Sequence, residues 1–431
     1  MTNDTSAGQE MYRLIETLYP ICRSITGNGV RETLRHIQRE IPALEMVEVP
    51  TGTEVFDWQV PREWNIRDAW IRRPDGKRIA QFSQSNLHVL NYSVPVHRRI
   101  TLEELRPHLF TLPDHPEWIP YKTSYYNENW GFCLSHREYE ALPEGEYEVF
   151  IDSTLEPGSL SYGEVVIPGT SDEEVLLSCH ICHPSLCNDN LSGIALMTAL
   201  AKALREKPLR YSYRFLFIPG TIGSITWLAR NEEKTGTIRH GLVVTCVGDG
   251  GPFTYKKSRR GDAVIDRAVT QVLKHRREDY RLIDFYPYGY DERQYCSPGF
   301  DLPVGSLSRS SHGQYPQYHT SADDLTLVRP QYLEASLDAY LQVIDVLERN
   351  RCYRNLKPKC EPQLGKRGLY DQIGGPSQRK IDAMALLWVL NLSDGTNDLL
   401  RIAERAEQPF DEIATAAEAL ARTDLLAPIE T

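Results

Sequence analysis

Short apolar runs alternate with longer amphipathic stretches between Glu146 and Arg349, and this is the clearest pattern along the chain. A short apolar run is typical of a buried strand, and apolar positions three and four residues apart are typical of a helix. The predicted strands are Tyr147–Ile151, Gly163–Ile167, Val175–Cys179, Tyr213–Ile218 and Leu242–Val247, and the predicted helices are Leu191–Arg205, Ile225–Arg230, Ala263–His275 and Pro330–Arg349. Such alternation predicts an α/β fold, in which a doubly wound, mostly parallel sheet carries helices on both faces.

Three other parts of the chain have different sequence patterns. Between residues 51 and 139, short alternating runs are separated by turn signals such as Pro74-Asp75-Gly76, which predicts an inserted β-rich domain. Residues 353–376 are rich in Pro, Gly and Lys and are interpreted as a linker. Helices predicted at Lys380–Leu390, Leu399–Ala406 and Pro409–Ala421 give residues 377–431 the spacing of a winged helix. Residues 1–50 and 140–352 then form the α/β domain.

Charge and cysteine usage narrow the classes of partner. The chain has 48 Lys and Arg against 59 Asp and Glu, a net charge of −11, which argues against broad binding to nucleic acid or to an anionic membrane. Acidic residues also outnumber basic ones from Arg379 onward, so the winged helix is interpreted as a structural, protein-binding or homo-oligomer contact. Nine Cys without a pairing framework, and no apolar leader or membrane-length apolar run, predict a cytoplasmic protein.

The strand predicted at Val175–Cys179 leads into a polar turn that holds His180, His183 and Asp189. Open α/β sheets bind ligands at the carboxyl ends of their strands, and imidazole with carboxylate is a natural beginning of a metal site. The simpler interpretation, a histidine that is only hydrogen-bonded, has about equal weight on spacing alone. Cys179-x-x-Cys182-His183 has the form of a haem-attachment motif, but an export signal is lacking and the motif begins inside a predicted buried strand.

Other predicted strand ends supply further polar candidates. Asp249 follows the strand Leu242–Val247, and His319 lies in a polar loop before the long helix Pro330–Arg349. With His180 and Asp189 they make two imidazoles and two carboxylates, a donor set that suits zinc. Such an ion lowers the pKa of bound water toward about 7, and amide hydrolysis also needs a carboxylate base beside that water.

These motifs resemble the co-catalytic zinc aminopeptidase superfamily. The resemblance lies in His180, Asp189-Asn190-Leu191-Ser192-Gly193, Asp249 and His319-Thr320-Ser321-Ala322-Asp323, in this order along the chain. It is closer to a narrower group that carries an inserted β-domain and a C-terminal winged helix, through Tyr19-Pro20-Ile21-Cys22-Arg23-Ser24, Glu63-Trp64-Asn65-Ile66-Arg67 and Asp291-Glu292-Arg293-Gln294-Tyr295. The resemblance implies zinc bound by His180, Asp189, Asp249 and His319, with Asp189 as the bridging carboxylate if a second ion binds. Proteins of the narrower group are frequently encoded beside genes for polysaccharide or natural-product biosynthesis, so the resemblance also implies a role in such a pathway.

The chain departs from the superfamily at the position of the general base. The resemblance implies paired Glu residues after the strand Tyr213–Ile218, whereas this chain has Gly220 and Thr221 there. Thr221 removes a ligand of the second metal and favours one zinc ion over two. Gly220 removes the base, a loss that costs about 10²–10⁴-fold in rate. Gly220 is interpreted in three ways: an engineered inactivation, a natural change in which Glu292 or Asp291 acts as base, or a protein that only binds its ligand.

The sequence therefore predicts a metal-dependent, aminopeptidase-like hydrolase that acts on a small peptide or amino-acid amide. Arg23 and the basic run that begins at Tyr255 are predicted to bind a substrate carboxylate. Asp291 or Glu292 is predicted to hold the substrate amine, with Arg293 beside them. The alternative function is a non-catalytic metal-binding or ligand-binding scaffold.

Overall fold

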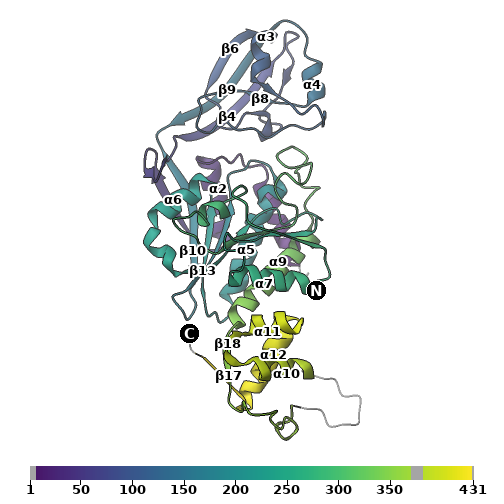
Figure 1. Cartoon of the computed structure of the whole chain (residues 1–431). Coiled ribbons are helices and arrows are strands. Elements are labelled where there is room, and N and C mark those ends of the chain that lie inside the picture. The colour runs from purple at the N-terminus through teal and green to yellow at the C-terminus, as the bar shows by residue number, and fades with distance from the viewer. Residues whose placement is uncertain (1–5, 370–381, 430–431) are drawn as a thin grey trace, which may run out of the picture. The chain divides into compact units, whose positions relative to one another are not determined.

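The computed structural model describes residues 6–369 and 382–429 (Figure 1). It separates into two compact units. The first runs to Gly261 and resumes over Arg281–Leu337, and the second combines Asp262–Tyr280 with the chain from Asp338 onward. The candidate chemistry lies in the first unit.

An eight-stranded sheet forms the centre of the first unit. Its strands are β1 (Glu45–Pro50), β10 (Ser159–Ile167), β11 (Glu174–His180), β12 (Ser212–Ile218), β13 (Ile238–Val244), β14 (Phe253–Lys256), β15 (Tyr280–Ile283) and β16 (Val304–Ser308), in the spatial order β1-β10-β12-β11-β13-β16-β14-β15. The four adjacent strands β12, β11, β13 and β16 are parallel. The outer strands β1, β10 and β14 pair antiparallel. The predicted fold class, a mostly parallel α/β sheet, is confirmed.

Helices cover this sheet. They are α1 (Ala7–Leu18), α2 (Asn28–Glu40), α5 (Ser192–Arg205), α6 (Ile222–Arg230) and α8 (Glu292–Tyr295). Helix α9 (Pro330–Arg349) begins in the first unit and continues into the second. Helix α5 contacts β10, β11, β12 and β13, and α1 and α2 contact α5 in turn (Figure 1). Ten of the fourteen residues of α5 are buried, as expected for a helix packed between a sheet and other helices. The helix that follows the candidate turn is therefore firmly fixed to the sheet.

The inserted β-rich part has its own antiparallel sheet, in the order β5-β4-β9-β6. Its strands are β4 (Glu63–Arg72), β5 (Arg78–Ile79), β6 (Val96–Thr101) and β9 (Glu146–Glu156); beside them lie α3 (Leu102–Leu105), α4 (His136–Glu140) and the short pairs β2 (Glu54–Val55) with β3 (Trp58–Gln59) and β7 (Leu109–Phe110) with β8 (Phe132–Cys133). The Tyr147–Ile151 run, predicted as a strand of the parallel sheet, belongs to β9. Buried residues alternate along β9, the pattern of a strand with one covered face, whereas β11 is buried throughout.

The second unit contains the winged helix. Its elements are α7 (Val264–His275), β17 (Cys352–Asn355), α10 (Ala383–Leu392), β18 (Asp394–Asp398), α11 (Leu399–Ala406), α12 (Phe410–Arg422) and β19 (Leu426–Pro428), with the three strands in the order β18-β17-β19. The predicted linker 353–376 begins inside β17, which is short and has little apolar character, and its part from residue 370 lies outside the described residues. Within the described ranges, every helix is too short or too polar to cross a bilayer.

Strand β4 is connected to the α/β core by an ion-pair network around Arg31 of α2. The guanidinium donates to Glu63 of β4 at 2.8 and 2.5 Å and to Glu48 of β1 at 3.0 Å. The hydrogen bonds from Arg31 lower the pKa of Glu63 to about 2. A carboxylate with a lowered pKa stabilises the fold above its ordinary pKa, and this contribution is lost as the pH falls through the lowered value.

Glu63→Gln is expected to reduce the free energy of unfolding by about 1–3 kcal/mol above about pH 5, because a charged hydrogen-bond acceptor is lost. The difference from the unmodified protein should shrink as the pH falls from the ordinary pKa of 4.5 toward 2. Urea unfolding across this pH range measures both effects. Glu54→Gln at an exposed position is the control and should change little; a pH-independent difference for Glu63→Gln would contradict the assignment.

Candidate metal centre

A turn at the carboxyl end of the parallel strands carries the candidate site. It begins after His180, the last residue of β11, and ends in the π-helical turn Cys187–Leu191 just before α5. Because β11 lies between β12 and β13, the turn is at the middle of the sheet edge, the usual position of ligand sites in open α/β sheets. The motif around Asp189 therefore lies where the sequence predicted its chemistry.

Three imidazoles converge on the carboxylate of Asp189, which has no solvent exposure. His180 Nε2 lies 2.8 Å from Asp189 Oδ1. His183 Nδ1 and His319 Nε2 lie 3.1 and 3.0 Å from Oδ2. His319 comes from a loop far along the sequence, so the cluster exists only in the folded chain.

Electrostatics keep this carboxylate ionised. Burial raises the pKa of Asp189, but the imidazoles of His183 and His180 outweigh burial and hold it well below its ordinary value. Burial likewise lowers the pKa of His183, and the charge of Asp189 reverses the direction and raises it. The result is an anionic oxygen pair surrounded by ring nitrogens.

The donor set fits a divalent metal such as zinc. His180, His183 and Asp189 offer ligand atoms within 4.8 Å of one another. Two donors bound at about 2.0–2.1 Å to one tetrahedral zinc ion lie roughly 3.3 Å apart, so only small movements separate the present arrangement from a coordinating one. Imidazole nitrogen and carboxylate oxygen are both ordinary zinc ligands.

Two buried side chains, Asp323 and Asn190, hold the backbone of the turn through hydrogen bonds. The Asp323 carboxylate accepts the amides of Asn188 at 2.5 Å and Asp189 at 2.9 Å, and burial raises the pKa of Asp323 to about 7. The Asn190 side chain donates to the carbonyls of His180 and Val244 and accepts from the amide of Cys246. The turn is therefore joined to the ends of both β11 and β13.

Of the four predicted metal ligands, the structure brings His180, Asp189 and His319 together. Asp249 is buried, and its carboxylate accepts hydrogen bonds from the hydroxyl and the amide of Ser310. Among the described residues, the group of possible metal ligands with mutually close atoms contains His180, His183 and Asp189 and neither Asp249 nor His319. The role of Asp249 as a ligand stays a prediction.

The residues predicted to bind substrate are mostly occupied by the protein. Arg23 is fully buried and donates to the carbonyls of His183 at 2.9 Å and Leu18 at 2.7 Å, and burial lowers its pKa to about 10. Arg23 thus supports the loop of His183. Tyr255 is buried on β14, where its ring packs over Gly305. A direct substrate contact by either residue stays a prediction that their burial disfavours.

Gly220 and Thr221 form a tight turn between β12 and α6. Thr221 has φ 64° and ψ −72°, and the amide of Ile222 donates to the Gly220 carbonyl at 2.9 Å, so the turn is a γ-turn of the rare, strained kind. Asp291 stabilises it by accepting from the Thr221 amide at 2.6 Å and from Ser224 Oγ at 3.0 Å. Arg293 also reaches the turn, through Nη2 to Thr221 Oγ1 at 3.4 Å.

Space is available for a side chain at Gly220. An added Cβ would lie 3.4 Å from His180 Cβ and 3.5 Å from Cys182 Sγ, both ordinary contacts, and the backbone there is not left-handed. A longer side chain at Gly220 would therefore begin beside His180.

Glu292, the predicted substitute base, is fully buried. Its Oε1 accepts from Lys256 Nζ at 2.8 Å, and Lys256 also donates to the Tyr288 carbonyl. This ion pair already occupies one oxygen of the carboxylate. Its role as base stays a prediction that this ion pair disfavours.

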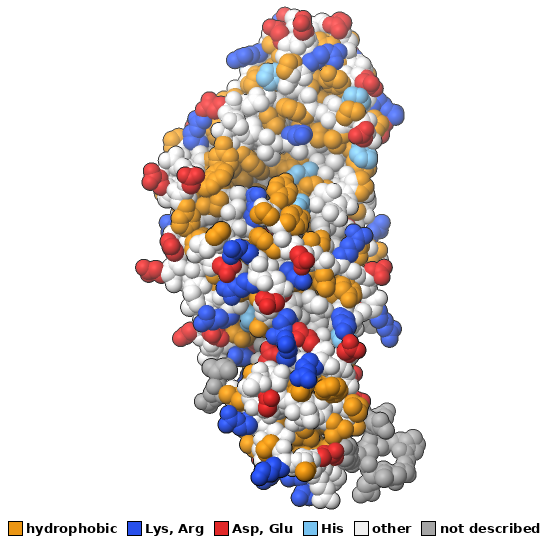
Figure 2. All heavy atoms as spheres, in the orientation of Figure 1, with side chains coloured by type: hydrophobic (Ala, Val, Ile, Leu, Met, Phe, Trp, Pro, Cys, Tyr) orange, Lys and Arg blue, Asp and Glu red, His pale blue; other side chains and the backbone are white. Residues whose placement is uncertain are grey.

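Aromatic rings enclose the centre. The Tyr121 ring of the inserted part lies 5.1 Å from those of His183 and His319, and the Tyr121 amide donates to the His319 carbonyl. Tyr318 stacks on His319, and Tyr290 stacks on His180. Figure 2 shows histidine side chains in a hollow bordered by hydrophobic side chains. The aromatic segment around Tyr121 is thus part of the wall of the site.

Two residues near the carboxylate were not chosen from the sequence. His183 was noted in the turn but not selected as a ligand, although its spacing from His180 was the available signal. Cys246 lies two residues after the end of β13, with Sγ 3.9 Å from Asp189 Oδ1 and 3.1 Å from the Tyr290 hydroxyl. A cysteine at the end of an apolar strand looks like a core residue in the sequence, so no local signal identified it.

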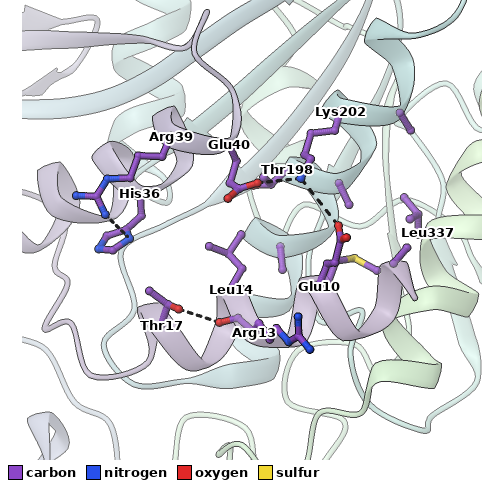
Figure 3. Close-up of a pocket in the computed structure, with 15 residues that line it drawn as sticks. Glu10, Arg13, Leu14, Thr17, His36, Arg39, Glu40, Thr198, Lys202 and Leu337 are labelled. Carbon is purple, nitrogen blue, oxygen red and sulfur yellow. Dashed lines mark hydrogen bonds and ion pairs between the residues drawn. The ribbon is translucent and has the colours of Figure 1, made fainter. Parts of the chain in front are cut away.

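A groove of about 660 Å³ lies elsewhere, between α1, α2 and α5 (Figure 3). Its charged side chains pair with one another, as Lys202 does with Glu40 at 2.8 Å and with Glu10 at 3.9 Å. None of the predicted site residues lines this groove. We assign it no part in the chemistry.

Family models cover nearly the whole chain. Residues 12–350 match the family described as a domain of unknown function (DUF4910), and residues 351–428 match a winged helix-turn-helix. A protein of Clostridium acetobutylicum, named "Putative polysaccharide biosynthesis protein with aminopeptidase-like domain", is 55% identical over 424 residues, which are 98% of this chain and 97% of that protein.

Solved structures described as peptidases or aminopeptidases also resemble this chain. A "putative peptidase" from Clostridium acetobutylicum is 54% identical and superposes with a TM-score of 0.94 over 99% of this chain and 98% of its own. A zinc aminopeptidase from Bacillus subtilis, 11% identical, has a TM-score of 0.59 over 79% of this chain and 94% of its own. A peptidase M28 precursor from Shewanella amazonensis, 14% identical, has a TM-score of 0.58 over 79% of this chain and 93% of its own. The predicted resemblance, an aminopeptidase-like fold with a C-terminal winged helix, is confirmed.

Gly220→Ala is expected to preserve the fold and to raise the free energy of unfolding by about 0.4–1 kcal/mol, because glycine is replaced where the backbone is not left-handed. Thermal unfolding measures the change. Gly27→Ala is the contrasting variant: Gly27 has φ 98° and an added Cβ would lie 2.0 Å from the Trp64 carbonyl oxygen, so it should destabilise. Destabilisation by Gly220→Ala would show that the turn has no room for a side chain.

Proposed function

The chain belongs to the family described as a domain of unknown function (DUF4910), and from this premise we propose that it is a metal-dependent hydrolase of amide bonds next to a free α-amine. The observation that carries the proposal is the convergence of three imidazoles on the buried carboxylate of Asp189. It occurs on an aminopeptidase-like fold, at the sheet edge where such folds bind their ligands.

His180, His183, His319 and Asp189 hold the metal in this proposal. A bound zinc ion supplies Lewis-acid polarisation of the amide carbonyl and activation of water. Asp323 fixes the backbone of Asp189, and Arg23 fixes the loop of His183, so the donors keep their positions before substrate arrives.

The substrate is a small peptide or amino-acid amide. The rings of Tyr121 and Tyr318 limit the space around the exposed edge of His319 and favour a compact ligand. Asp291 is the preferred contact for the substrate amine, since it lies against the Gly220–Thr221 turn, whereas Glu292 is already neutralised by Lys256. The name of the Clostridium acetobutylicum relative supports a role in a biosynthetic pathway.

The proposed site has no general base at the position where the resemblance places one. Gly220 has no side chain to take a proton, and Glu292 is paired with Lys256. We therefore expect slow turnover by the chain as it stands. The second candidate function, a metal-dependent ligand-binding scaffold, is favoured by the same absence of a base at Gly220, with the winged helix as a protein or homo-oligomer contact.

Gly220→Glu is expected to raise the hydrolysis rate by about 10²–10⁴-fold, because a carboxylate is placed beside the proposed metal site. The assay is hydrolysis of a panel of amino-acyl amides and dipeptides with zinc present. Gly220→Gln is the matched control, of nearly equal size but unable to take a proton, and should remain slow. If the unmodified chain is as active as Gly220→Glu, another group acts as the base. If Gly220→Glu binds metal but is inactive, the result favours the scaffold function.

Zinc should stabilise the folded chain, by about 2.7 kcal/mol at a free concentration 100 times the dissociation constant. His180→Ala is expected to weaken zinc binding by more than about 100-fold, since loss of a ligand exceeds loss of a supporting contact. Thermal unfolding with and without zinc, together with equilibrium dialysis, measures both. His97→Ala, an exposed histidine paired with Glu148, should leave zinc binding unchanged; equal loss in both variants would contradict the assignment.

A further inference from the structure

A small polar cavity borders the proposed metal centre. The ring of Tyr290 stacks on His180, with the ring centres 5.2 Å apart, and it also lines a cavity of about 10 Å³. The buried ion pair between Glu292 of α8 and Lys256 of β14 lines the same cavity. Hydroxyl-bearing residues complete much of its wall, namely Thr254, Ser306, Ser308 and Ser311. A cavity of this size has room for about one water-sized group.

One carboxylate oxygen of Glu292 has no partner within the protein. The side chain is fully buried, and its Oε1 accepts from Lys256 Nζ at 2.8 Å. Among the described residues, none forms a hydrogen bond with Oε2. Buried polar atoms are nearly always hydrogen-bonded, so an unpaired oxygen on a residue that lines a cavity indicates a donor that enters from outside the protein.

The loop before α8 holds the cavity in shape. Lys256 donates to the Tyr288 carbonyl at 2.6 Å, and its ammonium lies 3.9 Å from the centre of the Tyr286 ring. Gly289 has φ 148°, and an added Cβ would overlap Glu292 Oε1. Only glycine therefore lets the loop backbone approach this carboxylate so closely. The cavity is thus formed before any ligand binds.

His312 is a second link between the cavity and the proposed metal centre. It lines the cavity, and its ring lies 5.1 Å from that of Tyr290. Burial lowers the pKa of His312, and the carboxylates of both Glu292 and Asp189 act on it in the opposite direction. One imidazole thus lies within the electrostatic influence of both carboxylates, which places the cavity beside the centre.

Charge and size determine which group suits the cavity. The ammonium of Lys256 neutralises the carboxylate of Glu292, so a charged ligand group would lose its hydration without gaining a net counter-charge. The entering group must donate to Oε2 and must be no larger than about one water molecule. A hydroxyl meets both conditions, and it can also accept from the hydroxyls of the wall.

We propose that this cavity binds the side-chain hydroxyl of the substrate's amino-terminal residue, with Glu292 as the acceptor that determines specificity. Asp291, the preferred contact for the substrate amine, directly precedes Glu292, so both contacts come from one turn of the chain. A site built to bind a hydroxyl discriminates against the analogue that lacks it, because its buried acceptor is then left unpaired. The inference rests on the proposed function, since it names the substrate class of that site.

The test compares pairs of amino-acid amides that have nearly equal shape and differ by one hydroxyl. Threoninamide against valinamide places the hydroxyl on the β-carbon, and homoserinamide against norvalinamide places it on the γ-carbon. Isothermal titration calorimetry of the zinc-loaded full chain gives the dissociation constants. In at least one pair we expect the hydroxylated amide to bind about 10–100-fold more tightly, the effect of one hydrogen bond to a charged group.

Two variants remove the acceptor in different ways. Lys256→Met combined with Glu292→Met replaces the ion pair by apolar side chains of similar volume, a change that buried ion pairs often tolerate, and it should abolish the preference for the hydroxyl. Glu292→Gln keeps the shape but offers only a neutral group, so it should reduce the preference. Lys257→Met combined with Asp284→Met is the matched control; it removes the neighbouring exposed ion pair, whose atoms are 2.9 Å apart, and should keep the preference.

The outcomes separate this inference from the proposed function. Equal affinities within both pairs, the result expected if the cavity holds only water, would overturn the inference and leave the proposed function standing. A preference that persists undiminished in both Glu292 variants would do the same. If the chain takes up no zinc, or binds zinc but none of the four amides, the inference and the proposed function both fail.

Discussion

The buried charge of Asp189 is the constraint on which the rest of the site depends. An ionised carboxylate without exposure to solvent is costly unless it is paired and hydrogen-bonded. The fold meets this requirement with three imidazoles from the β11–α5 turn and the His319 loop. The same arrangement collects atoms of the kinds that coordinate metals, so the contacts that stabilise the buried charge are also those that the proposed metal site would use.

Support for this charge comes from several parts of the chain. Asp323 holds the backbone of the turn, and Arg23 holds the carbonyl of His183 from the segment between α1 and α2. The inserted β-rich part contributes through Tyr121, whose amide donates to the His319 carbonyl and whose ring borders two imidazoles. The insertion therefore forms part of the site, and its removal would change the position of His319 as well as its surroundings.

Sequence patterns identified the parts of the site that local chemistry specifies. His180 and Asp189 stand out because a buried strand, a polar turn and a helix follow one another, and that order fixes them at the sheet edge. His319 stood out through its family motif. Cys246 and the engagement of Asp249 by Ser310 depend on which residues meet after folding, and a single sequence does not contain that information. In the fold, the fully buried β11 was predictable. The strand β9 was assigned to the wrong sheet, because an alternating pattern does not reveal which sheet a strand joins, and β17 was not predicted, because it is short and polar.

The γ-turn at Thr221 has a consequence for how this site can change. Asp291 holds its backbone through the Thr221 amide and Ser224, and Gly220 takes no part in those bonds. The shape of the turn is therefore independent of the side chain at position 220, and a point mutation in a glycine codon can introduce glutamate there. A carboxylate can therefore be gained or lost at position 220 without rebuilding the turn. The backbone that would position a proton-transferring group and the side chain that would be that group are separate features of this molecule.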